Sequence, residues 1–166
     1  MDIVLRCVQL AVPAMLLSAP FVFYKRTGLR MRAFCITMAT KPKRRKKYKL
    51  ILAIAVLLFN YTFFALDGAS LWQVPGLALG FVMLRDKTAD AILQWLHADR
   101  VILGIAFGLW LLSLTAPELY PMSASMGLVI SSAMFYPSRT ILEQATLSQS
   151  YLESHLTDKD IVSLYF

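Results

Sequence analysis

Five apolar runs, divided by short polar segments, dominate this chain of 166 residues. A helix needs about 20 predominantly apolar residues (roughly 17–25) to cross a bilayer, so runs of about 14 to 18 residues lie at the short end. Flanking Tyr and Trp rings extend them, because such rings are comfortable at the headgroup level. The pattern predicts an all-α integral membrane protein with about five short transmembrane helices, at 7–24, 50–66, 71–84, 101–116 and 122–136.

Composition supports lipid as the solvent. Hydrophobic residues make up 58% of the chain and charged residues 16%, whereas soluble domains typically contain about 45–50% and about 25%. A soluble protein of this size could not bury so much apolar surface, whereas a bilayer can cover it.

The placement of basic residues predicts the orientation. Of the 17 Lys and Arg residues, 11 lie in segment 25–49, which contains no acidic residue. Five alternating crossings would place 16 basic residues on one side and none on the other, with Arg6 left at the end of the first run, where its side chain can extend outward. Because basic loops stay in the cytoplasm, we expect the N-terminus outside and the C-terminus cytoplasmic, in a bacterial inner membrane. The first run does not resemble a signal peptide, since its positive block follows the apolar core.

The chain divides into a polytopic transmembrane domain, 1–137, and a cytoplasmic amphipathic tail, 138–166. Segment 25–49 is predicted to be a basic cytoplasmic loop. Segment 86–99 places Ala89, Ile92, Leu93 and Leu96 at helical spacing and predicts an amphipathic helix along the inner interface, capped by Asp86 or Thr88. The tail predicts a similar helix over about 138–156.

The basic run is the strongest local signal in the sequence. We interpret it as a topology determinant that also contacts anionic lipid headgroups, each basic residue contributing about 1 kcal/mol near a negative surface. Nucleic acid binding would require interleaved aromatic residues or a recognisable fold, and only Tyr48 is present. The residues predicted to contact lipid are Lys41, Lys43, Arg44, Arg45, Lys46, Lys47 and Lys49.

Small residues recur at a spacing of four on three of the predicted helices. In lipid, where apolar association has no hydrophobic drive, such faces let helix backbones approach closely. Packing within the chain and packing onto a partner both remain open, and we expect at least one face to be used between subunits. The helix-packing residues are Gly76, Gly80, Gly104, Gly108, Ser123 and Gly127.

No pattern in the sequence indicates catalysis. No carboxylate or histidine falls in the middle of a predicted span, where ionisable residues normally mark function. His97 and His155 lack metal-ligand partners at a useful spacing, and Ser131-Ser132 lacks a nearby base. Asn60, inside the second run, is expected to form an interhelical hydrogen bond. We therefore expect a protein that is not an enzyme and needs no cofactor.

Three functions fit these features. The first is a small accessory or scaffold subunit of a larger membrane assembly (secretion, conjugation or envelope machinery) that acts by protein–protein contact. The second is an oligomeric small transporter or channel, with a passive pore lined by serines of the fifth run. The third is a membrane immunity or exclusion protein that recognises an incoming toxin or transfer apparatus. The expected partners are an anionic bilayer and other membrane subunits or further copies of the chain.

Overall fold

The computed structural model describes residues 29–68 and 71–145, together with Met15, Ser18, Val22, Asp160 and Ser163. The predicted crossing at 7–24 and the tail beyond residue 145 lie almost wholly outside these residues. The described elements are α2 (Leu29–Thr40), α3 (Pro42–Asp67), a 3-10 turn (Leu71–Gln73), α4 (Val74–Leu84), α5 (Asp86–Ala98), α6 (Arg100–Ser113), a second 3-10 turn (Pro117–Leu119), α7 (Tyr120–Met134) and α8 (Arg139–Ala145).

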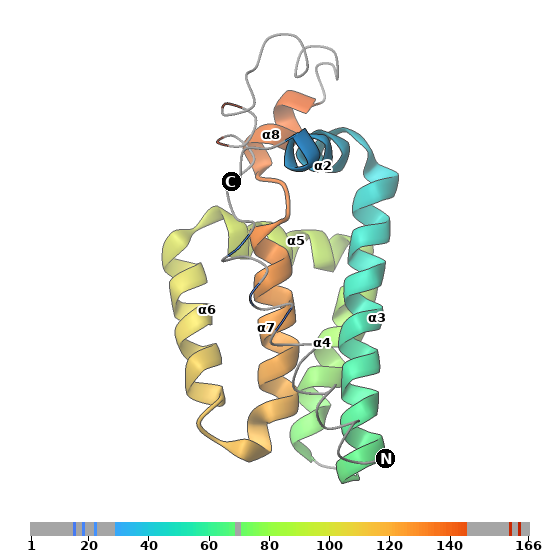
Figure 1. The fold of residues 1–166 in the computed structure, drawn as a ribbon, viewed down its shortest axis with the longest axis vertical. Coiled ribbons are helices and arrows are strands. Elements are labelled where there is room, and N and C mark those ends of the chain that lie inside the picture. Colours follow the sequence, from blue (N-terminus) through green and yellow to red (C-terminus); the bar gives the residue numbers. More distant parts are fainter. Residues whose placement is uncertain are drawn as a thin grey trace.

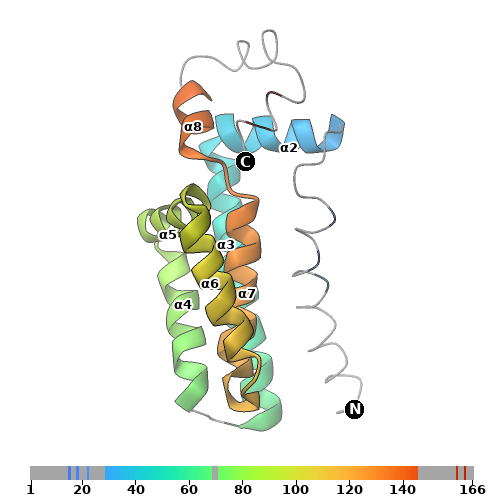
Figure 2. The same ribbon diagram turned by 90° about the vertical axis from the view of Figure 1, so that its left-hand side faces the viewer.

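The all-helical prediction is confirmed for this part of the chain, in which every regular element is a helix. Helices α3, α4, α6 and α7 run along the long axis of the molecule, whereas α5 lies across one end of them (Figure 1). Helices α2 and α8 lie beyond α5 and contact each other (Figure 2). The four long-axis helices therefore form a bundle, closed at one end by crossing helices.

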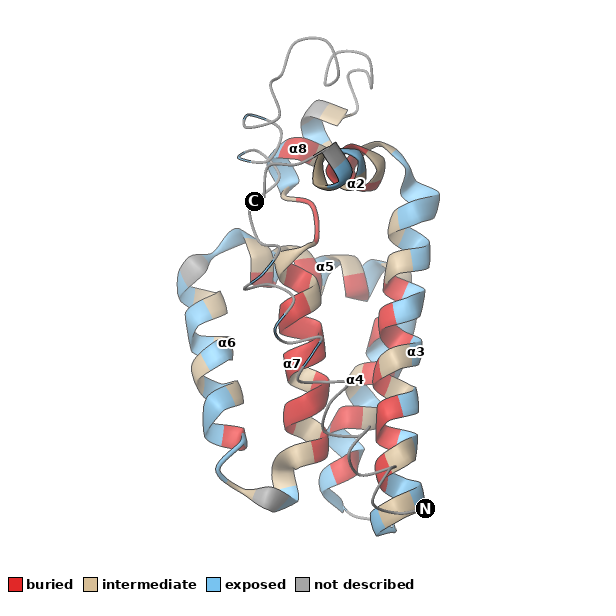
Figure 3. Cartoon of the chain, in the orientation of Figure 1, coloured by how far each residue is buried: buried red, intermediate tan, exposed pale blue. Residues whose placement is uncertain are grey.

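Helix α7 forms the middle of this bundle. It packs against α3, α4, α5 and α6, and most of its length is buried in Figure 3, whereas α6 is largely exposed. Its buried residues are mostly small, including Ser123, Ala124, Ser125 and Gly127. Small side chains on the central helix let four neighbours approach it closely.

Segment 25–49, predicted to be a basic loop, is largely helical in the structure. Helix α2 occupies part of it, and α3 begins at Pro42, so the basic run forms the first turns of the same helix that carries the second apolar run. Proline suits a first helical position, because the N–H that it lacks would have no intrahelical partner there. The helix ends at Asp67 and is followed by Gly68, whose φ of 78° is in the left-handed region that glycine adopts at no steric cost.

The helix predicted over 86–99 is confirmed, but its apolar face and its cap differ from the prediction. Ala89, Leu93 and Leu96 are buried within the protein core, rather than directed away from the bundle. No side chain caps the start of α5: the hydroxyl of Thr88 donates to the carbonyl of Arg85, and Asp86 is the first helical residue. The carboxylate of Asp86 binds lysines of α3 instead.

Among the described helices, one is long and apolar enough to cross a membrane, namely α3. The pair α5 and α6 reaches the same length together but is bent by 101°, and Leu71–Leu84 is shorter. Core helices of soluble proteins also meet these criteria, but they are mostly buried, whereas 33% of the apolar window of α3 is buried. One candidate span is thus shown, compared with the five predicted.

Candidate functional site: a buried lysine at one end of the bundle

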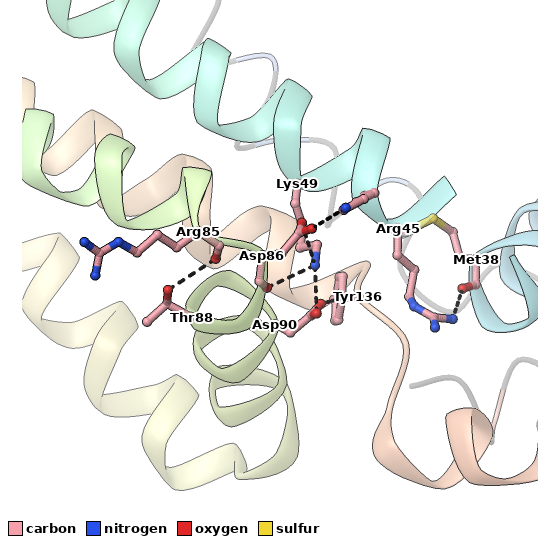
Figure 4. Close-up of polar contacts among 9 residues, drawn as sticks. Met38, Arg45, Lys49, Arg85, Asp86, Thr88, Asp90 and Tyr136 are labelled. Atoms are coloured by element: carbon pink, nitrogen blue, oxygen red, sulfur yellow. Dashed lines mark hydrogen bonds and ion pairs between the residues drawn. The ribbon is translucent and has the colours of Figure 1, made fainter. Parts of the chain in front are cut away.

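Lys49 of α3 is 4% exposed and lies between two carboxylates of α5. Its Nζ is 2.7 Å from Asp90 Oδ2 and 3.3 Å from Asp86 Oδ1, and it donates to the backbone carbonyl of Asp86 at 3.1 Å. Figure 4 shows these contacts at the corner where α3 meets α5. All of these contacts bring negative charge or a carbonyl dipole to the buried ammonium, which is the condition for burying a charge at tolerable cost.

Helical spacing places the partners. Asp86 and Asp90 are four residues apart, so they share one face of α5, and Lys46 and Lys49 are three apart on α3. Lys46 Nζ lies 2.9 Å from Asp86 Oδ2. From the segment that follows α7, the hydroxyl of Tyr136 donates to Asp90 Oδ1. The network therefore joins α3, α5 and the end of α7.

Two further contacts secure the same end of α7. The hydroxyl of Tyr48 donates to the carbonyl of Ser132 at 3.0 Å, and Nδ1 of His97 lies 3.0 Å from the carbonyl of Ala133. Carbonyls in the last turn of a helix lack the usual i+4 partner; here the N–H groups of Phe135 and Tyr136 also donate to these two carbonyls, at 3.2 and 3.0 Å, and the side chains add second contacts from α3 and α5. These residues and the Lys49 network make this end a polar layer that fixes α5 across the bundle.

The arrangement has the chemistry of a structural ion-pair network. The ammonium of Lys49 is held by Asp86 and Asp90, and Tyr136 supplies a proton donor to the second carboxylate. The described residues contain no group of three or more His, Cys, Asp or Glu that could hold a metal ion. What the network does is hold three helices in one relative orientation.

The pKa of Asp86 predicts acid sensitivity. Hydrogen bonds from Lys46 and then Lys49 hold the pKa of this carboxyl below its ordinary value. Because the folded pKa is depressed, the stabilisation is fully present above about pH 4 and is lost as the pH falls through the folded pKa.

We expect Lys46→Ala to reduce the fall in melting temperature between pH 7 and pH 3, measured by circular dichroism in detergent. Lys87→Ala removes an exposed lysine of α5, next to Asp86 in the chain, and should leave that fall as in the wild type; an unchanged fall in Lys46→Ala would contradict this account.

The structure divides the predicted lipid-contact residues into two groups. Lys49 is buried in the network, and the guanidinium of Arg45 donates from Nη1 to the carbonyls of Met38 and Ala39 at 3.0 and 2.7 Å. These two residues are directed into the protein, in contrast with the prediction that they contact lipid. Five members of the run remain exposed: Lys41, Lys43, Arg44, Lys46 and Lys47.

Of the predicted helix-packing residues, some lie at contacts between helices and others lie on an open helix face. A Cβ atom at Gly76 would lie 2.4 Å from Asn60 Oδ1, and one at Gly80 would lie 2.6 Å from Leu57 Cδ2, so both glycines allow α4 to approach α3 closely. Ser123 and Gly127 are buried on α7. A Cβ at Gly104 or Gly108 would meet nothing within 4 Å, and these glycines lie on an open face of α6.

Asn60 forms the interhelical hydrogen bond that the sequence predicts. Its Nδ2 donates to Ser125 Oγ at 2.8 Å and to the carbonyl of Val56, and the Ser125 hydroxyl donates to the carbonyl of Pro121. Together with Gly76, these residues link α3, α4 and α7 in the interior of the bundle.

Sequence reasoning missed the Lys49 network, although a signal for it exists. The buried face of α3 repeats at intervals of three and four residues, and Lys49 falls in register with it. Interpreting 25–49 as a loop started the predicted helix at residue 50, one residue too late to include Lys49. The buried positions in this register are Lys49, Ala53, Val56, Asn60 and Phe63.

Comparison of the chain with protein-family models, curated proteins and solved structures finds no match.

Proposed function

We propose that the chain is a polytopic membrane protein that serves as a non-enzymatic subunit of a larger membrane assembly and acts through helix–helix contact. The observation that supports this proposal most is the outward face of α6. Val101, Ile105 and Leu112 are 67%, 59% and 67% exposed, and helical spacing places Gly104 and Gly108 on the same face. In water such a surface would be a strong association or aggregation site.

The interior of the bundle supports a lipid environment. Asn60, Gln73, Ser123 and Ser125 are buried, whereas many large apolar side chains of α3, α4 and α6 are exposed. Soluble proteins place large apolar residues inside. In membranes, helices associate through small residues and interhelical hydrogen bonds, because lipid tails solvate the apolar side chains.

The proposed topology keeps the five crossings and the cytoplasmic C-terminus. Helices α3, α4, α6 and α7 would supply four crossings and segment 7–24 the first. With 11 residues, α4 would reach about 16 Å, which is short of a hydrocarbon core of about 30 Å. Such a helix would depend on protein neighbours, the preceding 3-10 turn and local thinning of the bilayer.

The open face of α6 predicts an assembly defect. Gly108→Leu should reduce recovery of the partner subunits in mild detergent at least fivefold, because the new side chain holds the helices apart, while the melting temperature of the chain does not fall, since leucine is the better helix former. Ala78→Leu, which adds similar bulk at an exposed position of α4, should leave recovery unchanged. A wild-type chain that purifies alone as a monomer would refute the subunit role.

The same purification separates the alternative functions. A co-purifying secretion, conjugation or envelope component supports the scaffold role, whereas a toxin or transfer protein captured from outside supports immunity or exclusion. Ion or solute flux through liposomes containing the chain alone would support a channel, with Ser131→Leu as the variant that should abolish it. In the described bundle, Ser123 and Ser125 are fully buried, which favours packing over a pore at these two positions.

A further inference from the structure

A cleft of about 430 Å³ opens where the basic end of α3 passes the end of α4. Four lysines of α3 line it: Lys43, Lys46, Lys47 and Lys49. The rest of its wall consists of Leu50, Met83, Leu84 and Asp86. Basic and apolar side chains thus meet in one concave site.

The lining carries an excess of positive charge. Asp86 is the only acidic residue among the residues that line the cleft, against four lysines. Its carboxylate is bound to Lys46 and Lys49, at 2.9 and 3.3 Å. Lys43 and Lys47 are exposed and add two further positive charges at the mouth of the cleft. The site is therefore complementary to an anion.

An exposed apolar stripe continues from the cleft along α3. Leu50, Ile54 and Leu58 are 51%, 52% and 60% exposed. Lys43 and Lys47 precede them at intervals of three and four residues, so all five side chains lie on one face of the helix. Along this face, cationic groups are followed by about two turns of apolar surface.

We propose that this cleft binds the phosphate headgroup of an anionic phospholipid, whose acyl chains lie along the stripe from Leu50 to Leu58. The order of charge and apolar surface matches the order of headgroup and chains in a lipid, whereas a nucleic acid has no counterpart to the stripe. The proposal rests on the membrane location proposed above. It replaces a diffuse basic contact with a defined site, in which Lys43 and Lys47 bind the headgroup and Lys46 and Lys49 form the charged wall.

A charge-matched pair of double variants tests the site. Native mass spectrometry would measure binding of phosphatidylglycerol and phosphatidylcholine to the full chain in detergent. For Lys43→Ala/Lys47→Ala we expect phosphatidylglycerol affinity to fall about 30-fold, from the loss of two basic contacts, with phosphatidylcholine binding unchanged. Lys41→Ala/Arg44→Ala removes the same charge from exposed positions that do not line the cleft, and it should change the affinity less than threefold. Equal losses in both double variants would overturn the site.

Further experiments identify the ligand and distinguish failure of the lipid site from failure of the proposed membrane location. Inorganic phosphate at millimolar concentration should fail to displace the lipid, and Leu50→Gln should weaken lipid binding; displacement by phosphate together with unchanged binding in Leu50→Gln would overturn a lipid ligand. Extraction of the wild-type chain from membranes by alkaline carbonate would refute the membrane location itself. A chain that resists carbonate but binds both lipids equally refutes only the lipid site.

Discussion

Lys49→Met is expected to lower the free energy of unfolding by about 2 kcal/mol, and the melting temperature by about 6 °C. Methionine fills nearly the same volume but leaves Asp90 without its closest cation, 2.7 Å away in the wild type. Removing one partner of a buried pair costs about 3–5 kcal/mol. The side chain of Asp90 is 39% exposed, so water compensates for part of that loss. Thermal unfolding followed by circular dichroism in detergent measures the change.

Two variants make this prediction specific to the network. Lys41→Met removes an exposed lysine that immediately precedes α3 and should leave the melting temperature unchanged. Lys49→Met/Asp90→Asn removes both charges, while the amide oxygen can still accept the hydrogen bond from Tyr136, so it should recover at least half of the loss. A double variant as unstable as the sum of its single changes would show that Lys49 and Asp90 do not act together.

Gly76→Ala is expected to be the more damaging change, at about 3 kcal/mol. The new Cβ would lie 2.4 Å from Asn60 Oδ1 and 3.0 Å from Ser125 Oγ, and neither side chain can move without breaking the hydrogen bond between them. Overpacking costs about 1–3 kcal/mol, and an interhelical hydrogen bond in a membrane protein contributes about 0.6 kcal/mol, at most about 1.7. The same thermal unfolding experiment measures the combined effect.

The chain offers a matched control for this substitution. Gly104→Ala adds the same methyl group where nothing lies within 4 Å, so its melting temperature should be at least that of the wild type, because alanine favours a helix over glycine by about 0.5–1 kcal/mol. Asn60→Ala/Gly76→Ala makes room for the new methyl group and should be more stable than Gly76→Ala alone. If Gly76→Ala and Gly104→Ala were equally stable, the close approach of α4 to α3 would be refuted.

Apolar periodicity predicted the helices well, because length and burial pattern are local properties of the sequence. The four apolar runs that lie in the described part of the chain coincide with helices, and the amphipathic segment at 86–99 is α5. The start of α3 was wrong by eight residues, since charge density was interpreted as a loop although Lys and Arg are good helix formers. The direction in which α5 lies across the bundle was not predictable, because it depends on Lys49, a residue 37 positions before Asp86 in the chain.

For the site residues as well, the sequence predicted which residues share a helix face but not which face contacts another helix. A spacing of four identified all the glycines that share a helix face, but it could not say which face meets another helix. Gly76 and Gly104 have the same sequence context at this level, yet one lies against Asn60 and the other faces open space. Likewise, Lys47 and Lys49 belong to one basic run, and only their position relative to the buried face of α3 separates an exposed cation from a buried one.

The central position of α7 has a consequence for the order in which the protein can fold. Tyr48 and Asn60 reach their partners on α7 across 84 and 65 residues of chain, so these contacts form only after the fourth of the long-axis helices has been synthesised. Until then, α3 and α4 can pair through Gly76 and Gly80, but the amide of Asn60 lacks Ser125. Closure is therefore a late, non-local event, and a ribosome that stops before Tyr120 would release helices α2 to α6 with the amide of Asn60 still lacking its partner on α7.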